Sequence, residues 1–538
     1  MRSRRFLPGL LLALFTLTWV LAPPAPPGEA QTPKRGGTLR VSYGNEIANL
    51  DFHTAPGYEM MWVAMNVGCG LIDITPDGKF VADAADSWTV SPDSLLYTFK
   101  LKKNVLFHDG TPVDAAAVKF SIDHLMDPKT KSGMRSFYDS VHSVEALDPL
   151  TVQVRMKQPY AFFLHMLAAY RTGLILYSPA ATQKFTIEDR KQGKPGAVVG
   201  CGPFKLVEWV KGSHLAMERF DKYFNPGRPY VDKILIRTIK DPVTEMAAFK
   251  NGEIDFIASF SPEHVDTLKA QVPKAHLMTG KETTPMVAAM KVTVPKDGKP
   301  MSKERAPHPL FGDLRVRKAV GCYGMDRNEI VKIAFKGKAT PWLGMAPPGT
   351  LESMDLNAMC PYDPAKAKAL LAEAGYGPQK PLTFEVMADT EKSVFNVIAT
   401  VIKEQMARIG VTANIRVLDK VSWMNTTLQD GPWDMYVEDL LSLLTIDSNG
   451  YLSNSTSTWS HPRHNDTKVD DYYARYAKEI DPAKRKAIGK ELLEYMADKM
   501  YWNNVSGSPF YMAAQPWVKG YTYNAEFEVH WDTVWLDK

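Results

Sequence analysis

The sequence lacks a marked excess of charge of either sign. Among its 538 residues, 64 lysines and arginines stand against 60 aspartates and glutamates, a formal net charge of +4. Nucleic-acid binding normally needs a clustered surplus of lysine and arginine, so we expect no nucleic-acid partner. The 45 % hydrophobic and 23 % charged residues are typical of a folded globular protein rather than a disordered or fibrous one. The length predicts several domains, each of about 150 residues.

Cysteine is scarce, with four residues in the chain: Cys69, Cys201, Cys322 and Cys360. No two stand at C-x-x-C spacing, so the sequence predicts neither a cysteine zinc site nor a redox dithiol. An even number of cysteines in an exported protein permits disulfides. Two bridges, one bridge or four buried thiols remain open at this point, and we expect at least one bridge.

The motifs of the common enzyme classes are missing. The chain has no phosphate-binding G-x-x-x-x-G-K-[ST], no H-E-x-x-H and no G-x-S-x-G. Residues 200–204 begin like a dinucleotide-binding turn, but Pro203 and the strand after it exclude the required helix. His461 and His464 flank a proline, which favours a loop over a metal site. We therefore predict no catalytic residue, cofactor or metal, although spacing alone leaves a carboxylate pair open.

Long apolar runs are absent after the first 30 residues. Three of the first five residues are arginines, residues 6–21 are mostly apolar, and small residues occupy positions 28 and 30. This order predicts a signal peptide over 1–30, with a retained anchor helix as the alternative. Because no cysteine follows the cut, we expect a periplasmic protein without a lipid anchor. The export route, general or twin-arginine, stays open.

Strand-like and helix-like segments alternate along the rest of the chain, which predicts an α/β fold. Apolar and polar residues alternate as in half-buried strands over 38–43, 95–101 and 150–156, and residues 205–210 and 214–220 flank a Lys-Gly turn as in a hairpin.

The clearest predicted helix spans 391–409 and stops at Gly410. Five apolar residues recur at helical spacing and predict one continuous buried face: Val394, Val397, Ile398, Val401 and Ile402. Two further helices are predicted to begin at Asp-Pro pairs, at Asp363 and Asp481, where the aspartate caps the first turn.

One local pattern occurs twice. Gly252 and Gly431 each follow a predicted helix, and an aspartate, Asp255 or Asp434, comes three residues later at the start of a short strand. The two junctions either agree by coincidence or indicate two α/β lobes of similar build.

Several blocks, in the right order, resemble the family-5 extracellular solute-binding proteins, the dipeptide, oligopeptide and nickel group that serves ABC importers. They are residues 36–41 with 50–51, 84–88 with 97–101, 107–113, 201–206, 313–319 with 325–327, and 362–375. Phe52 stands where proline is usual, and Cys201 stands where threonine is usual. The resemblance covers nearly the whole chain after the leader.

The resemblance implies a bilobed α/β fold of the type II periplasmic-binding-protein class with an extra N-terminal subdomain. Lobe I would comprise 36–60, 195–285 and 506–538, the subdomain 61–194, and lobe II 286–505. A ligand would lie in the cleft between the lobes, where hinge closure buries it.

Peptide-binding members hold the ligand ammonium with an aspartate shortly after the strand that corresponds to residues 433–437. In this chain that position falls at Ser442 or Leu443, so the expected carboxylate is missing and a peptide ligand is in doubt. Glu438 and Asp439, a few residues earlier, either meet a cationic ligand group or lie exposed at a strand end.

Other candidate ligand-binding residues come from loops that match the family. They are Tyr58 after the first strand, Met134, Arg135 and Phe137 in the subdomain, Met286 and Gly507 near the two lobe crossings, and Trp423. Trp423 either lines the pocket or packs in the core. Arg135 either pairs with a ligand carboxylate or is a solvated surface charge.

The resemblance implies a periplasmic substrate-binding protein that captures a small solute, peptide-like or another small organic molecule. It would act as a monomer without catalysis and deliver the solute to the permease and ATPase subunits of an ABC transporter. An exported hydrolase on a similar scaffold and a sensor that presents its ligand to a receptor are the alternatives.

Overall fold

The computed structural model describes residues 32–538 except 55–57, 76, 169–173, 281, 283, 300–301, 347, 349–351, 391, 440–451, 453–455, 458–462, 510 and 524–528. The predicted signal peptide, Ser442, Leu443 and His461 therefore lie outside the described residues. Residues 34–538 form one unit by their internal contacts. Within the described ranges, no helix is long and apolar enough to span a membrane.

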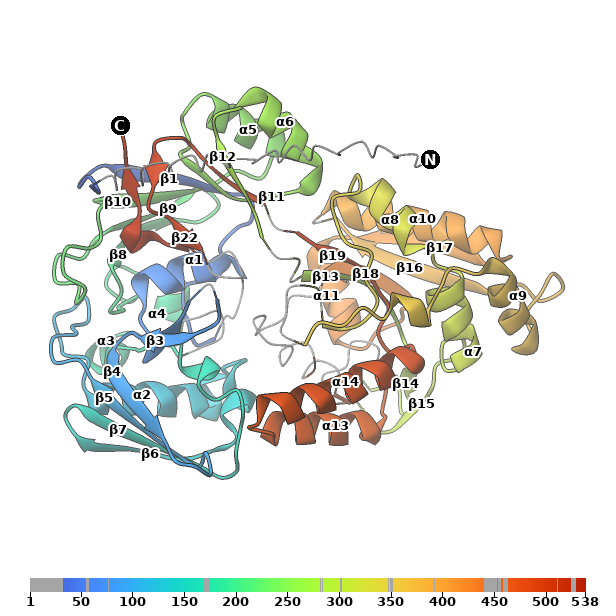
Figure 1. The fold of residues 1–538 in the computed structure, drawn as a ribbon, viewed down its shortest axis with the longest axis horizontal. Coiled ribbons are helices and arrows are strands. Elements are labelled where there is room, and N and C mark those ends of the chain that lie inside the picture. The colour runs from blue at the N-terminus through green and yellow to red at the C-terminus, as the bar shows by residue number, and fades with distance from the viewer. Residues whose placement is uncertain are drawn as a thin grey trace, which may run out of the picture. The chain divides into compact units, whose positions relative to one another are not determined.

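A seven-stranded sheet combines strands from both ends of this unit, in the order β12-β20-β11-β1-β10-β9-β8 (Figure 1). The strands are β1 (Thr38–Tyr43), β8 (Phe204–Val210), β9 (His214–Arg219), β10 (Lys233–Thr238), β11 (Phe256–Phe260), β12 (His276–Thr279) and β20 (Tyr511–Ala514). β1 lies between β10 and β11 and is parallel to both. The predicted strand over 38–43 and the predicted hairpin, which is β8 and β9, are confirmed.

A five-stranded sheet has the order β17-β16-β18-β13-β19. Its strands are β13 (Thr284–Met290), β16 (Thr383–Asp389), β17 (Thr412–Leu418), β18 (Met435–Asp439) and β19 (Asn504–Ser508). β16 is parallel to β17 and β18, whereas β13 is antiparallel to β18 and β19. The chain therefore passes from the first sheet to the second between Thr279 and Thr284, and returns between Ser508 and Tyr511.

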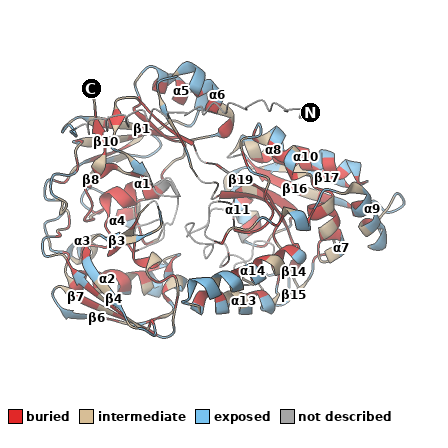
Figure 2. Ribbon diagram, viewed as in Figure 1, coloured by how far each residue is buried: buried red, intermediate tan, exposed pale blue. Residues whose placement is uncertain are grey.

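The helices outside the four-stranded sheet are α1 (Tyr58–Val67), α3 (Pro179–Lys184), α4 (Ile187–Lys191), α5 (Pro242–Lys250), α6 (Val265–Gln271), α7 (Leu314–Arg317), α8 (Arg327–Ala334), α9 (Pro364–Glu373), α10 (Ser393–Arg408), α11 (Lys420–Leu428), α13 (Thr467–Lys478) and α14 (Pro482–Asp498). Among them, α1 and α5 contact strands of the seven-stranded sheet, and α8, α10 and α11 contact strands of the five-stranded sheet. The predicted caps at Asp363 and Asp481 are present, because each carboxylate accepts a hydrogen bond from an amide of the first turn. Figure 2 shows exposed residues along α9 and α13, which mark their solvent sides.

The predicted apolar face of the helix over 391–409 is partly wrong. α10 buries Phe395, Ile398 and Ile402 against the sheet, whereas Val397 is 37 % exposed. The buried stripe is rotated because Phe395, together with Gln405 and Met406 at the far end, also enters the core. A count of aliphatic residues at helical spacing missed the aromatic anchor and the buried amide.

A four-stranded antiparallel sheet has the order β4-β5-β7-β6, and the helix α2 (Ala115–Met126) packs on it. Its strands are β4 (Ala85–Val90), β5 (Leu96–Leu101), β6 (Val141–Asp148) and β7 (Thr151–Met156). The predicted strands over 95–101 and 150–156 are therefore confirmed. Short pairs complete the chain: β2 (Ile72–Ile74) with β3 (Phe80–Ala82), β14 (Thr293–Pro295) with β15 (Arg305–Pro307), β21 (Val518–Lys519) with β24 (Trp535–Leu536), and β22 (Thr522–Tyr523) with β23 (Val529–His530).

All four cysteines are paired, as Cys69–Cys201 and Cys322–Cys360. The first bridge joins the end of α1 to the strand β8. Gly200 and Gly202 flank it, and a Cβ at either position would overlap the backbone of residues 66–68. The chain segments therefore approach more closely there than any larger residue allows.

The repeated Gly-x-x-Asp pattern marks equivalent junctions in the two large sheets. Asp255 Oδ2 accepts a hydrogen bond from the backbone amide of Arg40 on the neighbouring parallel strand β1, at 3.0 Å. Asp434 Oδ2 accepts one from the amide of Glu385 on the neighbouring parallel strand β16, at 2.9 Å. In both cases a helix leads into a strand whose preceding aspartate caps the adjacent strand, so the two junctions share a contact as well as a sequence pattern.

Candidate functional site

One edge of the five-stranded sheet gathers several of the predicted residues. β16 and β18 are parallel and end there at Asp389 and Asp439. The antiparallel register places Met286 opposite both Asp439 and Ser506. The two chain crossings also leave the sheet at this edge. Ligands of open α/β sheets bind at the carboxyl ends of parallel strands, so this edge is the candidate site.

Three acids and two lysines form a charged cluster at this edge, made of Asp389, Lys392, Lys420, Glu438 and Asp439. Lys420 Nζ donates to Asp389 Oδ2 and to Glu438 Oε1, at 3.0 Å in each case. Lys392 Nζ pairs with the Asp439 carboxylate. Strand ends supply the acids, while the lysines stand at the starts of the helices α10 and α11.

The acids of the charged cluster lie deeper than its lysines. The side chains of Asp389, Asp439 and Glu438 are 0 %, 8 % and 15 % exposed, against 35 % for Lys392 and 32 % for Lys420. Burial raises the pKa of Glu438 to about 8, although Lys420 acts in the opposite direction. Near neutral pH, therefore, a largely protonated Glu438 leaves two carboxylates facing two ammonium groups.

Trp423 lies beneath Lys420 on the same helix. Lys420 Nζ stands 4.8 Å from the centroid of the Trp423 ring, and that ring meets Tyr436 of β18 edge-on at 5.2 Å. The Trp423 side chain is buried in the core. The tryptophan thus supports a lysine of the charged cluster from the core side.

The two crossings touch each other through Glu282 and Gly507. Thr340 donates its backbone amide and its hydroxyl to the Glu282 carboxylate, at 2.9 and 3.0 Å, while the Gly507 amide donates to the Thr340 carbonyl at 2.9 Å. A Cβ on Gly507 would overlap the Glu282 side chain. Burial raises the pKa of Glu282. A carboxylate and a glycine therefore set how closely the crossings pass.

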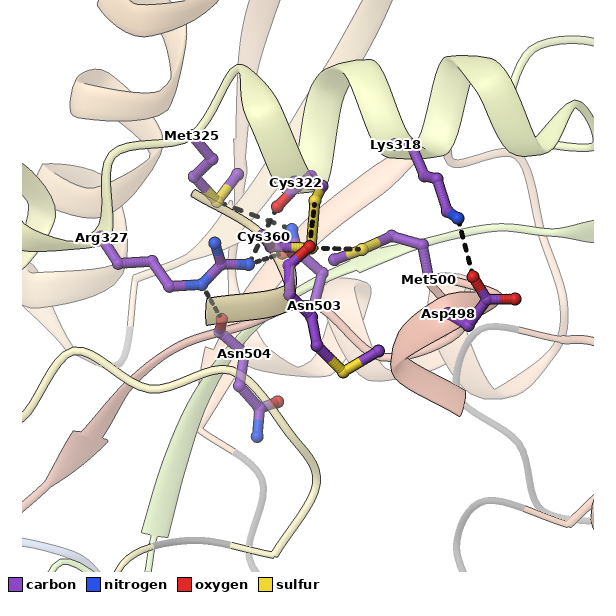
Figure 3. Close-up of a disulfide and its surroundings, with 11 residues drawn as sticks. Lys318, Cys322, Met325, Arg327, Cys360, Asp498, Met500, Asn503 and Asn504 are labelled. Carbon is purple, nitrogen blue, oxygen red and sulfur yellow. Dashed lines mark hydrogen bonds and ion pairs between the residues drawn. A yellow bond between two sulfur atoms is a disulfide. The ribbon is translucent and has the colours of Figure 1, made fainter. Parts of the chain in front are cut away.

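The strand that carries Gly507 is anchored by a buried arginine next to the second disulfide (Figure 3). Arg327 donates to the carbonyls of Asn504 and Gly321 and to the Asn503 side chain, at 2.8, 2.9 and 2.8 Å. Burial lowers the pKa of this guanidinium to about 10. The Cys322–Cys360 bridge holds the helical segment before Arg327, and Cys360 Sγ lies 3.9 Å from Met500 Sδ. These contacts position the start of β19.

The predicted subdomain residues lie on a short helical segment, Arg135–Tyr138. Met134 is buried and Phe137 packs against the core. The exposed Arg135 donates Nε to the Met126 carbonyl at 2.9 Å, which satisfies the end of α2. Tyr58 begins α1. The structure thus gives Met134 and Arg135 packing and capping contacts of their own.

Sequence analysis missed Asp389, Lys392, Lys420 and Glu282. The first three lie at strand–helix junctions scattered over 31 residues, from Asp389 to Lys420, and no motif unites them. The available signal was positional, because Asp389 is the last residue of β16, and β16 is parallel to β18, the strand that carries Glu438. Glu282 lies in a crossing whose partner is far away in sequence.

A polar cavity of about 240 Å³ lies apart from the charged cluster, beside the first disulfide. Its charged lining residues are Asp73, Asp83, Arg228, His530 and Asp532. His530 pairs with Asp73 and Arg228 with Asp532, at 3.3 and 3.2 Å. Burial and the neighbouring Asp73 raise the pKa of Asp83 to about 7. None of the lining residues belongs to the five-stranded sheet, so the cavity and the sheet edge are separate candidates.

Metal binding was predicted absent. In the described part of the chain, no group of three or more His, Cys, Asp and Glu side chains has the arrangement of a metal site. His464 is buried, with its ring stacked on Tyr501 at 4.5 Å, and its Nδ1 accepts from the Asp466 amide.

Comparisons with known proteins agree on one family. The model of the bacterial extracellular solute-binding proteins, family 5, matches residues 79–462. The glutathione-binding protein GsiB of Escherichia coli K12 is 29 % identical over 474 residues, covering 86 % of this chain and 87 % of GsiB.

Two solved structures show the same fold. The ABC transporter substrate-binding protein CtaP of Listeria monocytogenes superposes with a TM-score of 0.80 at 24 % identity, over 94 % of this chain and 100 % of CtaP. The binding protein AgaA of A. tumefaciens R10, in complex with agropinic acid, gives 0.77 at 26 % identity, over 93 % of this chain and 99 % of AgaA.

Proposed function

Since the chain belongs to the family-5 bacterial extracellular solute-binding proteins, we propose that it captures a peptide-like or other small organic solute between two lobes and delivers it to an ABC permease. The observation that carries this proposal is the charged cluster at the sheet edge from which both chain crossings leave. A ligand bound there contacts the elements that would move when the lobes close.

The proposed lobes follow the two large sheets. Lobe I comprises residues 36–60, 195–285 and 506–538, the subdomain residues 61–194, and lobe II residues 286–505. Supporting this division, β1, β8–β12 and β20 share one sheet while β13 and β16–β19 share the other. From the strand bounds, we propose that the hinges lie in the stretches between Thr279 and Thr284 and between Ser508 and Tyr511.

A second contact between the proposed lobes lies far from the hinges. The Ala161 amide of the subdomain donates to the Ala477 carbonyl of α13 at 2.9 Å, and the rings of Phe162 and Tyr476 lie 5.4 Å apart. Arg485 of α14 stands over the Phe162 ring at 5.3 Å. Hinge opening would have to separate this contact, so its presence supports a closing motion as the functional movement.

The proposed binding surface on lobe II and at the crossings comprises Met286, Trp423, Glu438, Asp439, Ser442 and Gly507, to which we add Asp389, Lys392 and Lys420. Tyr58, Met134, Arg135 and Phe137 are proposed to act from the other side of the ligand. Because Trp423 and Met134 are buried here, they would shape the pocket wall rather than present polar groups.

Two relatives support a small, polar organic ligand. GsiB is named for glutathione and AgaA was solved with agropinic acid. We propose that the chain works in the periplasm after removal of a signal peptide over residues 1–30, as a monomer, with a permease and ATPase subunits as partners and without catalysis.

The test is native mass spectrometry of protein isolated from the periplasm of its own source, followed by thermal melting with the compound recovered. A ligand that binds only the folded state raises the melting temperature. A retained small molecule that raises it and is returned intact supports the proposal. A product chemically altered by the protein would favour the hydrolase alternative, and the absence of cargo together with no melting shift would contradict the proposal.

A further inference from the structure

The charged cluster presents lysines, not acids, to its surroundings. Lys392 and Lys420 are each about a third exposed, at 35 % and 32 %, whereas the Asp389 and Asp439 carboxylates behind them are 0 % and 8 % exposed. A molecule that approaches this edge therefore meets ammonium groups first. Its own cation would have to displace a lysine before it could reach a carboxylate.

The two ammonium groups are held in place before any ligand arrives. Lys420 Nζ is fixed from three sides, by Asp389 and Glu438 at 3.0 Å each and by the Trp423 ring at 4.8 Å. Lys392 Nζ is fixed by Asp439 and lies 5.8 Å from the Phe395 ring. Flexible lysines normally lose conformational entropy when they bind a ligand, and these have already lost it on folding.

The depth of the acids also opposes a cationic ligand. A cationic ligand that displaces Lys420 only exchanges one ammonium group for another at Asp389, a fully buried carboxylate, while it loses its own hydration and freedom of motion. Adding a carboxylate to the exposed side of the lysines breaks neither pair. A doubly charged anion is less suitable, because Asp389 and Asp439 stand behind the lysines and repel further negative charge.

We propose that, given the solute-binding function above, the ligand places a carboxylate on Lys392 or on Lys420 rather than an ammonium group on Glu438 or Asp439. The charged cluster then selects acids, and the lysine–carboxylate pairs inside it keep the ammonium groups in position. This assigns the two lysines, absent from the predicted site, as the residues that set ligand class.

The test uses two peptide series as probes: glutathione with its diethyl ester and its N-acetyl derivative, and trialanine with its amide and its N-acetyl derivative. Calorimetry measures the affinity of each probe for the wild type. The variants are Lys392→Met combined with Asp439→Asn, and Lys420→Met combined with Asp389→Asn. Each removes an ammonium group and its facing carboxylate together, so that no buried charge is left alone. The control is Lys403→Met, an exposed lysine on α10.

We expect the wild type to bind at least one free acid, roughly tenfold or more tightly than the matching ester or amide, and to tolerate N-acetylation. At least one of the paired variants should lose this preference while Lys403→Met keeps it. The inference is overturned if acid and ester bind equally, if N-acetylation abolishes binding while the paired variants retain it, or if no free acid in either series binds. In that last case, cargo found by native mass spectrometry would leave the proposed function standing, whereas missing cargo would count against both.

Discussion

The two large sheets share a construction but differ at the edges where the chain crosses between them. In both sheets a helix leads into a strand, and an aspartate before that strand caps its parallel neighbour, Asp255 in one and Asp434 in the other. The crossing edge of the seven-stranded sheet ends in aromatic residues, Tyr43, Phe260 and Tyr511. The equivalent edge of the five-stranded sheet carries the charged cluster.

This difference separates scaffold from recognition. The shared aspartates precede their strands, at the ends away from the crossing edges, and each accepts a hydrogen bond from an amide of the neighbouring parallel strand, so the same device works in both sheets. Among the described residues, the two crossing edges share no backbone contact of this kind, and their side chains differ in chemistry. A ligand held between them would find an apolar wall on one side and fixed polar anchors on the other, which is the usual composition of a small-molecule site.

The largest expected effect distinguishes the two aspartates. Asp255 is fully buried and accepts from Arg40, Trp517 and Lys538 in addition to the strand amide. Asp255→Ala leaves the Arg40 guanidinium without its carboxylate partner and should lower the free energy of unfolding by about 3 kcal/mol. Asp434→Ala, which loses the Glu385 amide and a weak His308 contact, should cost about 1 kcal/mol. Urea denaturation of both variants measures the difference. Equal losses in the free energy of unfolding would contradict the expected difference between the two aspartates.

The next effect concerns the crossings that join the sheets. Gly507→Ala forces a Cβ into the Glu282 side chain, so it should push the crossings apart and cost about 2 kcal/mol in ligand affinity or stability. Gly377→Ala is the matched control, since a Cβ there meets nothing within 4 Å.

Shortening the opposing side chain sharpens the test. Adding Glu282→Ala to Gly507→Ala removes the overlap and should restore part of the loss in melting temperature. A double variant no better than Gly507→Ala would mean that the two crossings do not limit each other.

A smaller effect is expected at the aromatic edge. Tyr511 is buried and lies 5.8 Å from the Phe260 ring. Tyr511→Leu should weaken binding of the retained cargo by about 1 kcal/mol without changing the preference between acids and esters, because the tyrosine side chain itself carries no charge. If Tyr511→Leu altered that preference as strongly as the lysine variants, the claim that the charged cluster alone sets the preference for acids would be wrong.

A pH dependence of the stability is expected at Glu438. Its neighbours are Lys420, Asp439, Asp389 and Tyr436, and burial raises its pKa from 4.5 to about 8. Between these values the folded state holds a proton that the unfolded state has lost, so stability falls as pH rises. Below pH 4.5 the contribution is fully present, and above about 8 it is lost.

Glu438→Gln should remove this slope, whereas the exposed Glu404→Gln should keep it. Melting temperatures recorded from about pH 4 to pH 9 compare the three proteins. Parallel curves for Glu438→Gln and the wild type would exclude Glu438 as the titrating group.

The blocks that identified the family describe the scaffold, which explains why the fold could be predicted and the ligand could not. Arg327, in the block 325–327, holds the backbone of β19, and Asp51, in the block 50–51, forms a buried pair with Arg190 at 2.6 Å. Arg327 serves backbone groups, and Asp51 also accepts from the nearby amides of His53 and Thr54, so each leaves a short and repeatable sequence mark.

The charged cluster leaves no such mark, because Asp389, Lys420 and Glu438 meet only after two parallel strands have been placed side by side. Glu438 and Asp439 could be predicted as candidate residues from their strand. Their pairing with Lys420 and Lys392 could not be predicted, because it depends on how the two strand–helix junctions pack. The prediction of the buried face of α10 was partly wrong for a related reason, because Phe395 and Gln405 are buried by neighbours distant in sequence.

The most direct test of the account is a crystal structure of the protein isolated from its native periplasm with its cargo bound. The account predicts density for a small molecule at the crossing edge of the five-stranded sheet, with a carboxylate oxygen within hydrogen-bond distance of Lys392 or Lys420. Cargo in the polar cavity beside Asp83 and His530, or cargo whose ammonium group replaces a lysine on Glu438 or Asp439, would contradict it.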